Sequence, residues 1–336
     1  TNLITGIATA YMDSIPMVAI TGQVPSNLLG RDIFQEVDIT GAASAFSKHS
    51  YLVKNANDIP RVVREAFHIA STGRPGPVLI DIPIDVQEQT LKKFDWPEEV
   101  NIRGYKPSVK GNDLQIKRVV ETIAKARQPL ICAGGGVWLA DAQEELLELA
   151  ETANIPVVKT MMGIGLMPTD HPLNLGMIGA HGNHCANKAL AKSDLLIMVG
   201  TRAADRAITS PDEIQRRMAT IHIDVDPAEI GKNMQAAVPL VGNVKVILRQ
   251  ILDMGVSSTD SADWLAMLRD YRKAELSRVF PKRPGSVFPG TAIRRLGAKL
   301  DEDAVVCVDV GQNQIFTCKY FPQKHGRLLT SGGLGT

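Results

Sequence analysis

Short apolar runs alternate along the chain with longer stretches whose hydrophobic residues recur at helical spacing. Seven runs predict strands. Most of them are apolar throughout rather than alternating, which is typical of strands buried on both faces of a parallel sheet. The runs are Pro16–Gly22, Pro77–Pro83, Pro129–Gly134, Pro156–Thr160, Leu195–Gly200, Thr220–Asp226 and Ala304–Gly311.

Amphipathic stretches between these runs predict helices. In the first of them Leu114, Val119, Val120 and Ile123 form one apolar stripe. The helical stretches are Asp113–Ala126, Ala140–Ala153, Val244–Leu252 and Ala262–Val279. This alternation of strand and helix favours α/β domains built on parallel sheets with right-handed crossovers.

Two proline-rich segments without periodicity, Asp95–Gly111 and Phe280–Gly290, are typical of linkers. They divide the chain into residues 1–95, 105–280 and 285–336. The first part begins within a helical stretch at Thr1, and the last holds one strand before a glycine-rich end. We therefore expect both ends to be cut inside domains and the middle domain to be complete.

Composition narrows the function classes. The 336 residues include 37 basic and 36 acidic side chains, a net charge of +1, so no bulk charge attracts nucleic acid or an anionic membrane. No apolar run reaches the length of a membrane span. Four cysteines without a CxxC pair indicate a reducing compartment, and we expect a cytoplasmic protein. Cys132 and Cys307 lie in apolar runs and are expected in the core.

Glycines and an aspartate follow two strands of the middle domain. Gly134–Gly136 come between a strand and a helix, where backbone amides can approach a phosphate, although a tight structural turn explains them equally well. Asp224 ends the strand TIHIDVD. It can bind ribose hydroxyls or cap a helix over Pro227–Lys232.

Charged and polar residues follow other strands. Among Arg202, Asp205 and Arg206, the two arginines can grip a diphosphate, or the three residues can form a solvated surface cluster. The sequence HGNHC at 181–185 lacks the further ligands that zinc requires, so we expect a structural or ligand-packing role and name no metal ligand. Val310–Asn313 is compatible with a diphosphate site or a plain turn, and spacing alone gives the loop Gly30–Glu36 no catalytic role. These residues indicate a nucleotide-binding α/β protein and leave its reaction open.

Several motifs in order resemble the large catalytic subunits of acetolactate synthases, which are thiamine-diphosphate-dependent enzymes. The resemblance covers essentially the whole chain. It rests on TNLITGIATAYMDSIPMVAITGQVP, GRDIFQEVDITG, SKHSYLVK, STGRPGPVLIDIP, GMIGAHG, DVDPAEIGK, VDVGQNQ and LTSGGLGT. It implies three-layer parallel-sheet domains: the second half of a pyrimidine-binding domain, a complete Rossmann-like FAD-binding domain, and the start of a diphosphate-binding domain.

The resemblance also implies the chemistry. Members decarboxylate pyruvate and join the two-carbon unit to pyruvate or 2-ketobutyrate, a step of branched-chain amino-acid biosynthesis. The cofactor carries the reaction and the protein orients it. By position, Phe34, Gln35 and Arg206 match residues near the reacting centre, and Gln312, Asn313 and Gly335 match residues at thiamine diphosphate.

FAD is structural in this family, and the resemblance implies a cleft for it at the carboxyl edge of the central sheet. The matching residues are Arg74, Gly135, Gly136, Thr160, Met161, Ile178, Gly179, Ala180, His181, Gly200, Thr201, Arg202, Ala203, Ala204, Asp224, Val225, Asn243 and Val244.

Some positions depart from the family pattern. Ile84 replaces a common lysine, Ala203 and Ala204 stand within RAADR where many members have RFDDR, Asn313 replaces histidine, and Asn243 replaces aspartate. The family's catalytic glutamate precedes Thr1 and its Mg²⁺ ligands follow Thr336, so we expect this piece alone to be inactive.

The resemblance further implies a homodimer or tetramer and a small regulatory subunit. A pyruvate oxidase or glyoxylate carboligase, or a non-catalytic FAD-binding module, remains an alternative.

Overall fold

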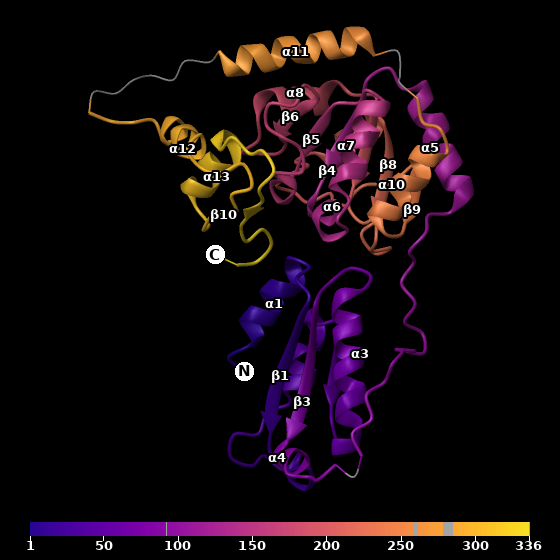
Figure 1. Cartoon of the computed structure of the whole chain (residues 1–336), viewed down its shortest axis with the longest axis vertical. Coiled ribbons are helices and arrows are strands. Elements are labelled where there is room, and N and C mark those ends of the chain that lie inside the picture. Colours follow the sequence, from indigo (N-terminus) through magenta and orange to yellow (C-terminus); the bar gives the residue numbers. More distant parts are fainter. Residues whose placement is uncertain (92, 258–260, 278–284, 336) are drawn as a thin grey trace. The chain divides into compact units, whose positions relative to one another are not determined.

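A computed structural model describes residues 1–91, 93–257, 261–277 and 285–335. The chain forms two compact units, one of Thr1–Pro107 with Ser331–Thr336 and one of Ser108–Thr330. Both units are shown in Figure 1. The three-domain division remains a prediction, and residues 285–330 group here with the larger unit.

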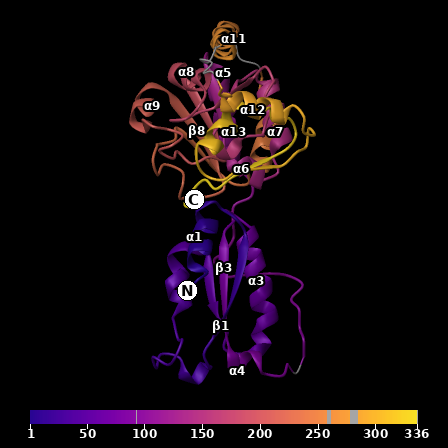
Figure 2. The same cartoon turned by 90° about the vertical axis from the view of Figure 1, so that its left-hand side faces the viewer.

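The smaller unit is built on three parallel strands in the order β1-β3-β2. They are β1 (Met17–Gln23), β2 (His49–Leu52) and β3 (Pro77–Pro83). The central strand β3 is buried at every position, and helix α3 (Ile59–Ser71) packs along it (Figure 2). The other helices are α1 (Ile4–Met12), α2 (Ile39–Ala43), α4 (Ile84–Gln87) and the 3₁₀ turns η1 (Ser26–Leu28), η2 (Ser44–Phe46) and η3 (Ala56–Asp58).

The larger unit contains a six-stranded, fully parallel sheet in the order β6-β5-β4-β7-β8-β9. Counted along the chain this is the 3-2-1-4-5-6 order of dinucleotide-binding folds, which reverses between β4 and β7. The strands are β4 (Pro129–Ala133), β5 (Val157–Lys159), β6 (Asn174–Met177), β7 (Leu195–Val199), β8 (Ala219–Asp224) and β9 (Val238–Val241).

Helices cover both faces of this sheet, which is why its central strands are apolar throughout. Ile131 of β4 belongs to a core with α5, α7 and α10, whereas its neighbour Cys132 faces a core with α8, α9 and α11. Figure 1 shows α11 beside α8. The helices are α5 (Asp113–Lys125), α6 (Gly135–Leu139), η4 (Met161–Gly163), α7 (Gln143–Thr152), α8 (His184–Lys192), α9 (Pro211–Arg217), α10 (Val244–Asp253) and α11 (Ala262–Leu276).

Two short parallel strands and two helices complete the larger unit. They are β10 (Val306–Cys307), β11 (Leu328–Leu329), α12 (Pro289–Gly297) and α13 (Gln312–Tyr320). The predicted strand Ala304–Gly311 is wrong in length, since only two of its residues pair. Cys307 is exposed rather than in the core for the same reason: so short a pair has little to cover it.

Other expectations need correction. Leu114 is exposed, and Ile116 takes its place in the buried stripe of α5. Part of the predicted linker Phe280–Gly290 is the start of α12, because Pro289 suits the first turn of a helix. Residues 280–284 of that linker and residues 278–279 of the predicted helix Ala262–Val279 lie outside the described residues.

The described residues of the first predicted linker, Asp95–Gly111, form no helix or strand. None of the helices in the described ranges combines the length and apolar character needed to cross a membrane.

Candidate functional site

The carboxyl ends of the six parallel strands bring together most residues predicted to hold FAD. These ends form one edge of the sheet, and ligands of such folds bind where the strand order reverses. Gly135 and Gly136 follow β4, and Gly200 and Thr201 follow β7, so both pairs lie at the reversal. Along the same edge lie Thr160, Met161, Ile178, Gly179, Ala180, His181, Arg202, Ala203, Ala204, Asp224, Val225, Asn243 and Val244.

Glycines at the reversal let two backbone segments touch. Gly136 N donates a hydrogen bond to Gly200 O at 2.9 Å, and Gly134 N donates to Val199 O at 3.0 Å. A Cβ on Gly134 would lie 2.4 Å from Gly200 O. The structural-turn interpretation therefore accounts for Gly134, Gly136 and Gly200. Gly135 differs, because its nearest neighbour would be the side chain of Met162 at 3.1 Å.

The loop after β6 and the loop after β7 are in contact. Gly179 has φ +107° and a Cβ there would lie 2.1 Å from Arg206 O, while Ala180 N donates to the same carbonyl at 3.1 Å. The loop after β6 is thus joined to the loop after β7. The side chains of Arg206 and Asp205 are 82% and 90% exposed and 3.9 Å apart, so in the structure this part of the cluster is solvated.

Asp224 ends β8 with a largely buried carboxylate, which accepts a hydrogen bond from Asp226 N at 2.9 Å. The alternative role of Asp224 as the cap of a helix over Pro227–Lys232 does not hold, because that segment forms turns, and Asp226 accepts a hydrogen bond from Ala228 N. Two residues earlier, His222 is buried with Nε2 3.1 Å from Thr201 O. Because a carbonyl only accepts, Nε2 must carry the hydrogen.

Burial lowers the pKa of His222, against the opposing effect of its hydrogen bond to Thr201. A neutral His222 therefore links the end of β7 to β8 at the carboxyl edge of the sheet. Sequence reasoning missed this residue, since a histidine inside an apolar strand has no pattern that marks it.

Asn243 serves the helix that follows it. Its side chain accepts a hydrogen bond from Val246 N at 3.2 Å and caps α10. Asparagine and aspartate cap equally well, so the departure from the family's aspartate keeps the local structure.

The HGNHC segment begins α8. His181 and His184 are exposed and Cys185 is buried. The amides of His184 and Cys185 donate to the Glu275 carboxylate of α11 at 3.2 and 2.9 Å, so Glu275 caps α8 from another helix. This supports the structural interpretation of the segment. Within the described residues, no three His, Cys, Asp or Glu side chains gather as a metal ion would need.

The loop Gly30–Glu36 of the smaller unit displays two of the predicted catalytic residues. Phe34 is 88% exposed, and Gln35 has φ 60°, a conformation that non-glycine residues rarely adopt. The Glu36 carboxylate accepts hydrogen bonds from the amides of Gly30 and Ile33. The hydrogen bond from Gly30 is the main reason why the pKa of Glu36 is lowered.

Two residues that sequence reasoning missed fasten this loop. Asp81 of β3 is 1% exposed and accepts hydrogen bonds from Thr21 Oγ1 at 2.7 Å and Gln23 Nε2 at 3.0 Å. Gln23 Nε2 also donates to Val37 O at 2.8 Å. The buried carboxylate thereby fixes the side chain that ties down the end of the loop.

The remaining predicted residues lie elsewhere. Arg74, in the smaller unit, donates from Nε to Ser14 Oγ at 2.9 Å and lies over the Tyr11 ring. Gln312 and Asn313 are exposed at the start of α13 in the larger unit.

Gly335 lies in the smaller unit, where a Cβ on it would meet Ser331 Oγ at 2.5 Å and Thr9 Cγ2 at 3.1 Å. This space is therefore filled by the chain's own side chains.

The sheet edge fits a dinucleotide in its chemistry. The strand order, the glycine turn after β4, the acidic end of β8 and the exposed arginine after β7 are the groups such a ligand uses.

Sequence comparison identifies the family. Residues 1–42 match the family described as "Thiamine pyrophosphate enzyme, N-terminal TPP binding domain", and residues 116–251 match "Thiamine pyrophosphate enzyme, central domain".

Relatives match the chain along its whole length. It is 44% identical to the "Probable acetolactate synthase large subunit" of Methanocaldococcus jannaschii and 46% identical to the "Acetolactate synthase large subunit IlvB1" of Mycobacterium tuberculosis. It is 45% identical to the "Acetolactate synthase large subunit" of Corynebacterium glutamicum. All of this chain is covered in each case, and it spans 58%, 55% and 54% of these relatives. The chain therefore belongs to the thiamine pyrophosphate enzymes and is similar to acetolactate synthase large subunits.

Proposed function

We propose that the chain is part of an acetolactate synthase catalytic subunit. Such an enzyme decarboxylates pyruvate and joins the two-carbon unit to a second 2-keto acid, giving 2-acetolactate or 2-aceto-2-hydroxybutyrate for branched-chain amino-acid biosynthesis. The observation that carries this proposal is the similarity of the whole chain, at 44–46% identity, to proteins with that name. The preformed loop bearing Phe34 and Gln35 supports it.

Thiamine diphosphate supplies, when bound, the nucleophilic carbon and the electron sink of such a reaction. The chain's own residues bind and orient. Gln35, held in the left-handed conformation by a loop that Glu36 closes, offers an amide to a polar substrate. Gln312 and Asn313 offer neutral donors to a diphosphate, and Asn313 Nδ2 already donates to Asp309 O at 3.0 Å, which sets its orientation.

FAD is proposed as a structural cofactor at the carboxyl edge of the six-stranded sheet. The main-chain amides of the glycine turn after β4 donate to the pyrophosphate, Asp224 accepts from ribose hydroxyls, and Arg202 and Arg206 pair with phosphate oxygens. Mg²⁺ is proposed for the holoenzyme, with no ligand among the described residues. We further propose a cytoplasmic homodimer or tetramer with a small regulatory subunit, which accords with the "large subunit" names of the relatives.

Product analysis tests the activity. The complete reading frame containing this chain, supplied with pyruvate, thiamine diphosphate, Mg²⁺ and FAD, should form acetolactate. Acetate, acetyl phosphate or tartronate semialdehyde as the product would instead identify a pyruvate oxidase or glyoxylate carboligase. We expect the 336-residue chain alone to form no acetolactate.

The flavin site is tested on the chain itself. A flavin absorption band should survive dialysis of the purified protein. Asp224→Ala should weaken FAD binding in equilibrium dialysis by about tenfold, the worth of a hydrogen bond to a charged group. Asp212→Ala, at an exposed position of α9, is the matched control and should leave the affinity unchanged. Equal affinities for all three proteins would contradict the assignment.

A further inference from the structure

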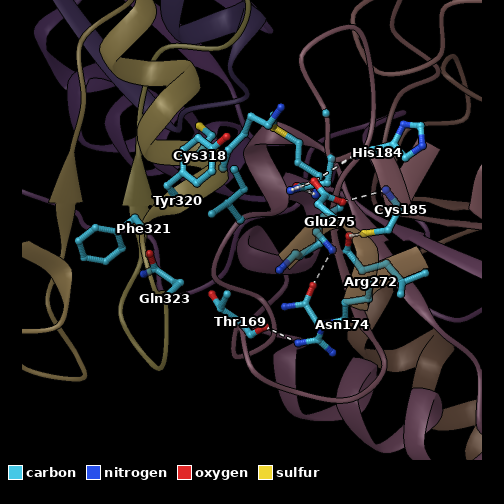
Figure 3. A pocket seen from close by; sticks show the side chains of 18 of the residues that line it. Thr169, Asn174, His184, Cys185, Arg272, Glu275, Cys318, Tyr320, Phe321 and Gln323 are labelled. Carbon is cyan, nitrogen blue, oxygen red and sulfur yellow. Dashed lines mark hydrogen bonds between the residues drawn. The ribbon is translucent and has the colours of Figure 1, made fainter. Parts of the chain in front are cut away.

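A cavity of about 430 Å³ lies in the larger unit among β6, α8, α11 and α13. Its walls and the labelled side chains are shown in Figure 3. Of the described residues that line it, none is among those predicted to hold FAD or thiamine diphosphate. The predicted FAD and thiamine diphosphate sites therefore do not account for this cavity.

Lys159, at the end of β5, is a buried cation in this wall. It is 4% exposed, and its recorded hydrogen bond runs from Nζ to Met167 O at 3.5 Å, the outer limit for such a contact. Within the described residues no carboxylate lies within 4.0 Å of Nζ. An ammonium has three hydrogens to donate, so most of its capacity is unused. Burial, aided by the charge of Arg272, lowers the pKa of Lys159 to about 7.

Gln323 has a side-chain oxygen that can accept a hydrogen bond, which complements the donor Lys159. It is 3% exposed, and its buried Oε1 has no hydrogen-bond partner among the described residues. Its main-chain oxygen accepts from Thr169 N at 2.8 Å, and Figure 3 shows the two residues side by side. Lys159 Nζ donates to Met167 O, two residues before Thr169. Lys159 and Gln323, whose side chains both have unused hydrogen-bonding capacity, are therefore held by the same short segment, residues 167–169.

The cavity has an excess of positive charge. The acidic and basic residues that line it are Lys159, His184, Arg272, Glu275, Arg294 and Lys319, and Glu275 is the single carboxylate among these described residues. The carboxylate of Glu275 is already engaged by the start of α8. The Arg272 guanidinium donates to the carbonyls of Thr169, His171 and Pro172, which fixes its position, and it forms no ion pair with a carboxylate of the described residues.

We propose that this cavity binds a small organic acid, with the carboxylate on Lys159 Nζ and a hydroxyl or amine hydrogen donated to Gln323 Oε1. A buried cation without an anion is costly, and a carboxylate offsets that cost. The apolar lining residues Ile164, Leu175, Met177 and Phe321 favour a ligand with a carbon skeleton over an inorganic oxyanion. The proposal is independent of thiamine chemistry.

Calorimetric titration of the 336-residue chain tests the proposal, with lactate, propionate and inorganic phosphate as probes. Lactate should bind, and propionate, which lacks the hydroxyl, should bind about three- to tenfold more weakly, the worth of one hydrogen bond. Gln323→Leu should abolish this preference while retaining propionate binding. Lys159→Met should abolish binding of both acids, whereas Lys188→Met, at an exposed position of α8, should change nothing.

Phosphate binding more tightly than lactate, or unchanged lactate binding by Lys159→Met, would overturn the proposal. So would the absence of lactate binding to the unsubstituted chain, which would leave water as the occupant. A second measurement applies if Lys159→Met does not fold. Lactate binding at pH 8, followed in buffers of different ionisation enthalpy, should take up a proton as Lys159 becomes charged. Binding without proton uptake would equally refute the role of Lys159.

Discussion

Gly136 and Gly200 meet backbone to backbone where the strand order of the larger sheet reverses, with Gly136 N donating to Gly200 O at 2.9 Å. A Cβ on Gly136 would lie 2.7 Å from Gly200 Cα, a distance that real Cβ atoms do not adopt. Main-chain atoms form both sides of this contact, and they cannot move aside as a flexible side chain can. The contact therefore requires glycine at both positions, whatever ligand the edge binds.

Gly136→Ala should destabilise the larger unit by about 1–3 kcal/mol, the usual cost of inserting a methyl group into a packed site. Urea unfolding followed by circular dichroism measures the loss. Gly135→Ala is the matched control and should lose less stability, because its Cβ would lie 3.1 Å from Met162 Cβ, a contact relieved by a shift of a few tenths of an ångström. Equal losses for the two variants would show that backbone contact is not the reason for Gly136.

Glu275→Gln should loosen α11 from α8. Burial would raise the pKa of Glu275, but the hydrogen bonds from Cys185, Asn183 and His184 outweigh it and the pKa is lowered. The charged carboxylate therefore stabilises the fold above its ordinary pKa of 4.5, and this contribution is lost as the pH falls through the lower folded value. We expect a loss of about 1–2 kcal/mol at pH 7, reduced by solvent screening.

Unfolding free energies of the two proteins between pH 3 and pH 7 check this expectation. The difference between unsubstituted chain and Glu275→Gln should shrink at the acid end. Lys273, exposed on the same helix, provides the control variant Lys273→Gln, which should show no such pH dependence. A difference that stays constant down to pH 3 would argue against a charged cap.

Lys159→Met should change how stability depends on pH in the alkaline range. The pKa of Lys159 is about 7 in the folded chain and 10.5 ordinarily, so between these values the unfolded state binds one more proton. Stability should therefore rise with pH across that window by about 1.4 kcal/mol per pH unit from this residue alone. The variant should lose that slope and be the more stable protein below pH 7.

Chemical denaturation at pH 6, 7, 8 and 9 measures the slope, with Lys188→Met as the exposed control. Identical slopes for the Lys159 variant and the control would mean that Lys159 is charged or solvated in the folded chain. Added lactate should flatten the slope of the unsubstituted protein, because a bound carboxylate keeps the ammonium protonated.

Asp81→Ala should release the loop that displays Phe34 and Gln35. Removing the carboxylate leaves Thr21 Oγ1 and Gln23 Nε2 without their acceptor, which costs about 1–3 kcal/mol. Gln23 then no longer holds Val37 O in place. Hydrogen exchange of the amides in residues 30–38 should accelerate.

Asp81→Asn, which retains one acceptor oxygen, should restore part of the protection, and Asp58→Ala, which breaks only a surface ion pair with Arg61, should leave the loop unchanged. Unaltered exchange in Asp81→Ala would show that the hydrogen bonds of Glu36 hold the loop without help from β3.

The amino-acid sequence alone predicts the strands that are buried in the centre of each sheet. β3 runs from Pro77 to Pro83 as its apolar run predicts, and β4 and β7 differ from prediction by one residue at the carboxyl end. Burial on both faces demands an unbroken apolar run, so local composition and tertiary position agree there. The glycines and arginines that follow these strands are recognisable for the same reason, since a parallel sheet places every carboxyl end on one edge.

Short edge strands and side-chain contacts over long chain separations depend on the folded chain. β6 contains Asn174 and Gly176 and β9 contains Pro239, and each becomes a strand only by pairing with β5 or β8. Glu275 reaches α8 from a distant helix, and Lys159 shares a cavity with Gln323 only after α13 has packed on the larger unit. The spacing of apolar residues predicts which face of a helix or strand is buried. Tertiary packing decides which residues that face contacts.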